Sequence, residues 1–140
     1  MKKKYGKWIL WGLFILYMAA LFRITVFRST FLAHGMWNGK FNLIPFLNLF
    51  VLLQKNGIVY FLYLFLGNII WFVPFGFFCG ALFKKAGYWT VLWGFLLSFL
   101  IEFLQFFGSS GVSETDDLIL NTLGAFLGIF LFCRIRQTTA

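Results

Sequence analysis

Acidic and metal-binding side chains are scarce in this chain. Its 140 residues include only four Asp and Glu, one His and two Cys. Two cysteines are too few for a disulfide framework or for the cysteine sets that hold zinc, and both lie in apolar runs, where a thiol behaves as a small hydrophobic group. A single histidine forms no cluster, and no nucleophile motif or phosphate-binding glycine loop is present. The sequence therefore predicts no metal centre and no cofactor.

Charged residues of both signs are also rare, at 11% of the chain, whereas hydrophobic residues make up 61% and aromatic residues 24%. Soluble domains are typically about 45–50% apolar and about 25% charged, and a soluble fold of this size cannot hide so much apolar surface in its core. Most of the chain is therefore predicted to lie in lipid. The net charge of +8 does not indicate nucleic-acid binding, because the basic residues form short groups between apolar runs instead of one patch.

Four apolar segments are long enough, or nearly so, to cross a bilayer as helices, which takes about 20 residues. We expect helices over residues 8–27, 58–83, 87–107 and 117–133, within a single membrane domain over residues 1–140. The predicted fold class is an all-α integral membrane protein with four transmembrane helices. The basic N-terminus also resembles a signal peptide, but apolar sequence continues past MAA at residues 18–20, which favours an uncleaved first helix.

The distribution of Lys and Arg predicts that both ends of the chain lie inside the cell, an N-in/C-in topology. The inner groups are Lys2, Lys3, Lys4, Lys7, Lys84, Lys85, Arg134 and Arg136, whereas the outer segments carry Arg28, Lys40 and Lys55. A long outer loop, residues 28–57, then joins the first two helices. It contains the apolar stretch FNLIPFLNLF, so we expect it to lie along the outer surface of the membrane or to dip back into it.

Several polar side chains interrupt the apolar segments at a similar depth. A charge at the membrane centre costs about 2.5–3.5 kcal/mol on insertion scales, so each of them needs a reason. Glu102 and Asn121 lie roughly 7 Å and 6 Å inside the outer ends of their expected helices, at about 1.5 Å per residue. Arg23 lies near the outer end of the first helix, and Gln105 shares a helix face with Glu102.

One face of the fourth expected helix has an ordered polar stripe. Asp117, Asn121, Gly124 and Gly128 follow one another at intervals of four, three and four residues, which places them on one side of a helix. We therefore predict that the acids line one outward-facing pocket. Simpler roles stay open: Asp116 fits a capping pattern with Ser113, Glu102 could pair with Arg23, and Asn121 could join two helices by a hydrogen bond.

Small residues and prolines mark expected helix contacts. Two GxxxG pairs, which let helices approach closely, are Gly76–Gly80 and Gly124–Gly128. These faces could also join two copies of the chain into a homo-oligomer. Pro74 removes the hydrogen bond to the carbonyl of Ile70, so we expect a kink in the second helix.

Four stretches of the sequence carry a family resemblance. They are NLIPF at residues 42–46, GNIIWFVPFGF at 67–77, SFLIEFLQ at 98–105 and DDLILNTLGAFLG at 116–128. Together, and in this order, they resemble the VanZ-like family of small bacterial membrane proteins. Two positions depart from the usual pattern of that family: Gly111 stands where an Arg is frequent, and Glu114 stands where an Asp is frequent.

The resemblance implies a multi-pass protein of the bacterial cytoplasmic membrane. The family's namesake is associated with low-level resistance to teicoplanin, a glycopeptide that carries a fatty chain. The positions shared by the resemblance and by the polar pattern are Asn42, Pro45, Asn68, Pro74, Glu102, Gln105, Asp116, Asp117 and Asn121.

The first functional hypothesis is a non-enzymatic protein of the cell envelope that binds an amphiphile at the outer acidic pocket. Its expected partners are membrane lipids and a lipoglycopeptide or lipid-linked cell-wall precursor. Its expected ligand-binding residues are Arg23, Asn42, Asn68, Glu102, Gln105, Asp116, Asp117 and Asn121.

Two alternatives from other classes stay open. A membrane-embedded enzyme acting on a lipid-linked substrate would use Glu102 as the catalytic general base, with Asp116 and Asp117 holding a divalent ion. A transporter component would place its site at Asn68 beside Pro74, in a broken helix, and would need oligomers of these four short spans.

Overall fold

Four long helices and a small sheet make up the structure, a computed structural model that describes residues 2–83 and 87–138. The elements in chain order are α1 (Lys2–Thr25), β1 (Lys40–Asn42), α2 (Leu47–Leu82), α3 (Tyr88–Phe107), β2 (Val112–Glu114) and α4 (Thr115–Thr138). Each helix is long and apolar enough to cross a membrane. The all-α membrane class is confirmed, with one addition: β1 and β2 form a parallel pair.

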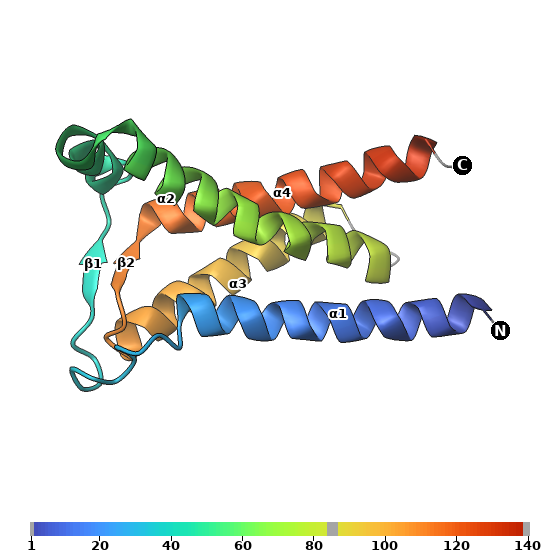
Figure 1. Cartoon of the computed structure of the whole chain (residues 1–140), viewed down its shortest axis with the longest axis horizontal. Helices are drawn as coiled ribbons and strands as arrows, with labels where there is room; N and C mark the ends of the chain where they lie inside the picture. The colour runs from blue at the N-terminus through green and yellow to red at the C-terminus, as the bar shows by residue number, and fades with distance from the viewer. Residues whose placement is uncertain (1, 84–86, 139–140) are drawn as a thin grey trace.

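The start of α1 and the end of α4 lie at the same end of the bundle, and the two strands lie at the other (Figure 1). We call these the terminal end and the strand end. An even number of membrane spans brings the two ends of a chain to the same side, and the four helices have this arrangement. Lys84 and Lys85, which were expected to mark the inner side, lie outside the described residues.

The second helix differs most from the sequence prediction. It begins at Leu47, well before the expected start at residue 58, and its backbone departs from helical geometry at Gly57, where φ is 81° and ψ is 173°. The first segment, residues 47–56, turns away from the long one at the strand end (Figure 1). The polar run Gln54, Lys55 and Asn56 interrupts the hydropathy pattern there, which is why the sequence assigned this segment to a loop.

The other bounds shift by smaller amounts. The expected spans 8–27 and 117–133 correspond to Lys2–Thr25 and Thr115–Thr138, and 87–107 corresponds to Tyr88–Phe107. The polar and basic ends of α1 and α4 continue the helices beyond their apolar cores. Pro74 lies inside α2, as expected. The residue of this helix with non-helical backbone angles is Gly57 and not a residue beside Pro74.

Glycines bring α2 and α4 into direct backbone contact. A Cβ atom added at Gly124 would collide with the carbonyl oxygen of Ile69, and one added at Gly128 would collide with that of Val73. In the other direction, a Cβ at Gly76 would collide with the carbonyl oxygen of Ala125. The two GxxxG faces therefore pack against each other within one chain. The expectation that they would join two copies is wrong for these faces, because they are already occupied.

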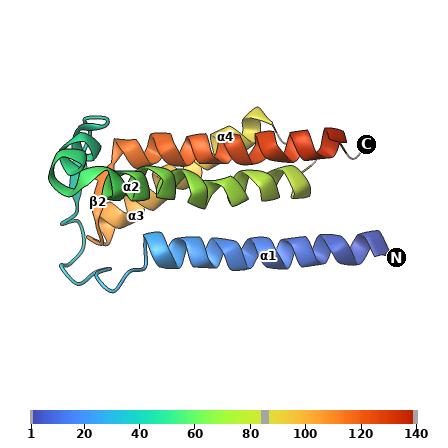
Figure 2. The same ribbon diagram turned by 45° about the horizontal axis from the view of Figure 1, so that its top comes forward.

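The core centres on α2 and receives one side of α1. Leu21, Phe72, Phe75, Cys79 and Ile101 are all buried and in contact in one cluster. The hydroxyl of Tyr17 donates a 2.6 Å hydrogen bond to the carbonyl of Trp71, which ties α1 to α2 one turn before Pro74. Figure 2 shows α1 along one side of the other three helices.

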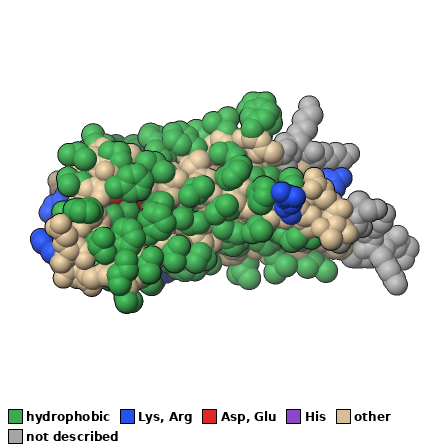
Figure 3. All heavy atoms as spheres, turned by 90° about the horizontal axis from the view of Figure 1, so that it is seen from above, with side chains coloured by type: hydrophobic (Ala, Val, Ile, Leu, Met, Phe, Trp, Pro, Cys, Tyr) green, Lys and Arg blue, Asp and Glu red, His purple; other side chains and the backbone are tan. Residues whose placement is uncertain are grey.

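The outer surface of the bundle is apolar, as a lipid-facing surface must be. Figure 3 shows hydrophobic side chains over the length of one face, with Lys and Arg toward its two ends. Large apolar side chains such as Leu16, Ile70 and Leu96 are more than half exposed, at 68%, 61% and 52%. In water this surface would drive aggregation, so lipid is its natural surrounding.

The connection after α1 packs across the strand end of α3. The backbone N–H of Leu32 donates to the carbonyl of Gly108 at 2.6 Å, and that of Trp37 donates to the carbonyl of Phe107 at 3.0 Å. The Trp37 ring meets Phe107 edge-on at 4.9 Å between centroids. This segment therefore covers the helix end and carries β1 to its partner β2.

Candidate functional site

The strand pair brings the early part of the chain to the acids. Its register places Lys40 opposite Val112 and Asn42 opposite Glu114. The hydroxyl of Thr115 donates to the backbone carbonyl of Asn42 at 3.3 Å, which extends the contact into the start of α4. The segment around Phe46 is thereby held beside the first turn of α4, which contains Asp116 and Asp117.

Each of the four acids accepts a hydrogen bond from an amide. Glu102 Oε2 accepts the backbone N–H of Glu114 at 2.9 Å. Glu114 Oε1 accepts the side-chain amide of Asn48 at 2.8 Å. On α4, Asp116 Oδ1 accepts the backbone N–H of Phe46 at 2.5 Å.

The fourth acid, Asp117, accepts a hydrogen bond from the side-chain amide of Asn68. Asp116 and Asp117 are adjacent in sequence but face different segments, the start of α2 and its long part. The Asp116 carboxylate therefore binds backbone from another element. The capping pattern with Ser113 had predicted that Asp116 would bind at the N-terminus of its own helix, so the observed partner is a different one.

No ion pair joins Arg23 to Glu102, both of which the structure describes. The Arg23 side chain is exposed and donates to the carbonyl of Phe27, near its own helix end. Arg28 similarly donates to the carbonyl of Ile24 at 3.0 Å. The alternative of an Arg23–Glu102 pair is thus contradicted, and the hydrogen bond that Arg23 makes is to a carbonyl near the end of its own helix.

Burial makes these carboxylates unusual. Asp116 is 0% exposed and Glu102 is 6% exposed, and the second oxygen of Asp116, Oδ2, has no hydrogen-bond partner among the described residues. Burying a polar group without a partner costs about 1–3 kcal/mol in proteins. The amide donors offset part of that cost, so the site depends on their positions being held by the strand pair.

Polar contacts also cross between α3 and α4. The side-chain amide of Asn121 donates to Ser98 Oγ at 2.9 Å, and both side chains are buried. The Ser98 hydroxyl lies 3.5 Å from the carbonyl oxygen of Asp117. The interhelical hydrogen bond considered for Asn121 is therefore present. Gln105 has a different contact, donating to the carbonyl of Thr25 at the end of α1 at 3.1 Å.

The remaining predicted residues lie around this site. Asn42 accepts the backbone N–H of Ile44 at 3.3 Å, and its own Nδ2 is buried without a partner among the described residues. Pro45 is exposed at the surface of the strand end, and Pro74 lies half-buried within α2.

A cavity opens beside Glu102. It has a volume of about 210 Å³, and its lining residues are Phe41, Phe99, Glu102, Phe103, Phe106 and Ser113. The Phe41 ring, from β1, stacks on that of Phe106 with 4.1 Å between centroids. Glu102 is the member of the predicted ligand-binding set that lines this cavity, whereas Asp117 is turned toward α2. The cavity therefore combines aromatic walls with one carboxylate.

The described residues contain no group of three His, Cys, Asp or Glu side chains placed to hold a metal ion. Asp116 and Asp117, which the enzyme alternative assigns to a divalent ion, bind Phe46 and Asn68 instead. The predicted set lacked three side chains that make polar contacts here, Asn48, Ser98 and Glu114. It also lacked the residues that line the cavity with Glu102, which are Phe41, Phe99, Phe103, Phe106 and Ser113. A usable signal for Asn48 is that it is an amide in an apolar stretch, six residues after Asn42.

The sequence of the chain is similar to a protein family and to one known protein. The family model described as VanZ/LLP1 matches residues 14–136. Protein VanZ of Enterococcus faecium is 28% identical over 131 residues, which cover 91% of this chain and 75% of that protein. No solved structure matches at a significant level.

Proposed function

Because the chain belongs to the VanZ/LLP1 family, as its four motifs indicated, we propose that it binds an amphiphile in the envelope of a bacterial cell. The ligand class is a lipoglycopeptide or a lipid-linked cell-wall precursor, and the proposed role is in resistance to teicoplanin. The site is the cavity beside Glu102, which this proposal places on the outer side of the cytoplasmic membrane.

The observation that carries the proposal is the composition of that cavity. Four of its lining side chains are phenylalanines, and one is a carboxylate. Aromatic walls suit an acyl chain or another apolar group, whereas a carboxylate suits an ammonium or hydroxyl group of the same ligand. An amphiphile presents both kinds of group within one molecule.

The size of the cavity sets how much of the ligand enters. Pockets that enclose a whole drug-sized ligand measure roughly 300–1,000 Å³, and this one measures about 210 Å³. It therefore admits a single group, such as one amine-bearing unit or part of a fatty chain. The rest of a lipoglycopeptide would lie over the strand end, where Phe41 and the exposed Leu43 and Ile44 offer apolar surface.

A binding measurement tests the proposal with a matched pair of ligands. Purified protein in nanodiscs is titrated with teicoplanin and with teicoplanin from which the fatty chain has been removed. We expect saturable binding of the intact molecule and weaker binding of the deacylated one. Equal binding of both, or binding of neither, would contradict the proposed amphiphile site. Chemical change of the ligand during the titration would favour the enzyme alternative instead.

Two variants locate the binding in the cavity. Glu102→Gln removes the charge at nearly constant volume, and Phe103→Ala removes one wall, so both should weaken binding by about tenfold or more, as loss of a buried charged contact or an aromatic anchor does at interfaces. The matched controls are Glu114→Gln and Phe95→Ala. The first removes a carboxylate outside the lining set and keeps a side-chain oxygen to accept the hydrogen bond from Asn48, and the second removes a lipid-facing phenylalanine one turn before Phe99. The same four variants at matched membrane levels are then compared for teicoplanin susceptibility in a sensitive Gram-positive host. Protection that survives Glu102→Gln and Phe103→Ala unchanged would place the function elsewhere.

A further inference from the structure

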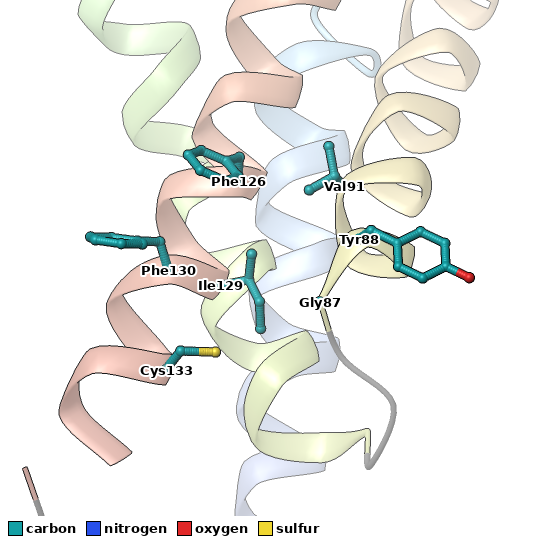
Figure 4. A pocket seen from close by; sticks show the side chains of 7 residues that line it. All are labelled: Gly87, Tyr88, Val91, Phe126, Ile129, Phe130 and Cys133. Atoms are coloured by element: carbon teal, nitrogen blue, oxygen red, sulfur yellow. The ribbon is translucent and has the colours of Figure 1, made fainter. Parts of the chain in front are cut away.

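A groove separate from the cavity beside Glu102 lies at the terminal end, between α3 and α4. Its apolar part is a cavity of about 310 Å³, with lining residues Gly87, Tyr88, Val91, Phe126, Ile129, Phe130 and Cys133. Figure 4 shows Val91 on α3 across from α4, Ile129 and Cys133 on α4 directed toward the space between the helices, and the Tyr88 ring directed away from α4. A Cβ atom added at Gly87 would meet nothing within 4 Å, so the space beside this residue is open.

The groove continues along α4 into a more polar part. An adjoining cavity of about 390 Å³ shares Phe130 and Cys133 and adds Arg134 and Gln137. Residues 126, 129, 130, 133, 134 and 137 recur at intervals of three and four, so they form one face of the helix. The apolar and polar cavities are therefore consecutive stretches of one groove, with the polar stretch nearer the helix end.

A cation is positioned at the polar stretch. The Arg134 guanidinium lies 5.1 Å from the centre of the Phe130 ring, a cation–π contact that keeps it over the groove. The four Asp and Glu residues of the chain are Glu102, Glu114, Asp116 and Asp117, and all of them lie at the strand end. The charge at this end of the groove is therefore positive, and among the described residues no Asp or Glu side chain lies nearby.

We propose that this groove binds one anionic phospholipid, with an acyl chain between α3 and α4 and its phosphate at Arg134. The charge complementarity between Arg134 and a phosphodiester selects the headgroup, and the guanidinium donates hydrogen bonds to phosphate oxygens. The apolar stretch accepts any acyl chain, so it supplies affinity without selectivity. Basic pockets between membrane helices bind anionic headgroups in this way. The groove is separate from the cavity beside Glu102, so either site can exist without the other.

The test counts lipid bound to the purified protein. Full-length protein in detergent is titrated with phosphatidylglycerol and with phosphatidylcholine of identical acyl chains, and native mass spectrometry measures the fraction that retains one lipid. We expect wild type to retain phosphatidylglycerol about fivefold more tightly than phosphatidylcholine, since one basic residue near the surface contributes roughly that factor. Equal retention of the two lipids by wild type would overturn the proposal.

Variants separate the headgroup contact from the groove. Arg134→Gln should bring the two lipids to equal retention, and Val91→Phe should reduce retention of both because the ring fills the apolar stretch. Lys7→Gln is the matched control: it removes a cation near the same end, on α1 and outside the lining set. Retained selectivity in Arg134→Gln, or a loss of selectivity in Lys7→Gln of equal size, would contradict the site. Free phosphate added in excess should not displace the lipid, because it lacks the chain.

Discussion

Asp116 is a fully buried acid whose carboxylate accepts a hydrogen bond from a distant backbone N–H. Its side chain is 0% exposed, and its contact with the backbone N–H of Phe46 holds the residue before α2 in place. Phe46 has a left-handed backbone with φ at 61°, and its own side chain makes no capping hydrogen bond. The carboxylate of Asp116 therefore satisfies a backbone donor at a helix start that local sequence does not cap.

We predict that Asp116→Ala lowers the free energy of unfolding by about 1–3 kcal/mol, because it removes the buried carboxylate that accepts the N–H of Phe46. Asp116→Asn should cost less, since an amide oxygen can still accept that hydrogen bond. The measurement is unfolding in detergent–SDS mixed micelles, followed by thiol labelling of the buried Cys79 in a Cys133→Ser background. Equal losses in the two variants would mean that the charge, and not the acceptor, is what the fold requires.

At the same scale, sequence reasoning selected the acids as candidates but did not find their hydrogen-bond partners. Glu102, Asp116 and Asp117 were expected to share one pocket, and the structure places them close to the same strand end with separate amide partners. Hydropathy finds a polar residue in an apolar run but carries no information on which distant amide it meets. The Asn48–Glu114 contact spans 66 residues, and no local pattern encodes it.

At the scale of the element, the glycine faces explain why α2 and α4 can touch backbone to backbone. The GxxxG spacing was visible in the sequence, and it correctly marked both faces. It could not say whether the partner is a second copy or another helix of the same chain, because the motif describes one surface only. Length and composition predicted the four helices, whereas the three-residue strands have no periodicity to detect.

We predict that Gly128→Val lowers the free energy of unfolding by about 2 kcal/mol or more, because overpacking a close contact forces the backbones apart and the clash is with the carbonyl of Val73. Gly67→Ala is the matched control, since a Cβ there meets nothing within 4 Å. It should be neutral or slightly stabilising, because alanine suits a helix interior better than glycine. The same Cys79 labelling assay reports both. Equal effects of the two substitutions would mean that the close approach is not what stabilises the bundle.

The break at Gly57 is a second element-scale feature. Its φ of 81° with ψ of 173° is a backbone conformation that essentially only glycine adopts. A residue with a side chain would straighten or strain this point, and residues 47–56 would then lose their angle to the rest of α2. Leu49, 4% exposed, packs beside Ile69 and Leu120. The position of residues 47–56 is therefore set by this packing, by the hydrogen bond of Phe46 to Asp116 and by the backbone of Gly57.

At the scale of the whole molecule, the acids lie at one end only, whereas Lys and Arg lie toward both ends. The acids gather at the strand end, and Arg134 and Arg136 lie in the last turns of α4 at the terminal end. Basic residues tend to stay on the cytoplasmic side during insertion, which is the physical basis for predicting an N-in/C-in orientation. The cavity beside Glu102 and the groove beside Arg134 would then open toward opposite leaflets.

We predict that a membrane-impermeant maleimide labels Ser29→Cys in intact cells and leaves Thr138→Cys unlabelled, each in a background of Cys79→Ala and Cys133→Ser. Both positions are exposed in the structure, at the strand end and the terminal end respectively. Labelling after the cells are broken is the control, and it should reach both. The reverse pattern would place the cavity beside Glu102 inside the cell, and a ligand from the outside could then not be its occupant.

The contact between Phe46 and Asp116 also sets an order in time. The two residues are 70 positions apart, and α2, α3 and β2 all lie between them. A ribosome makes the chain from its N-terminus, so Phe46, Asn48 and β1 are synthesised long before any of their acceptors. The strand end can therefore close only after α4 has begun to emerge. During biosynthesis this end of the molecule therefore stays open at least until the start of α4 has been made, although β1 and the start of α2 are complete by then.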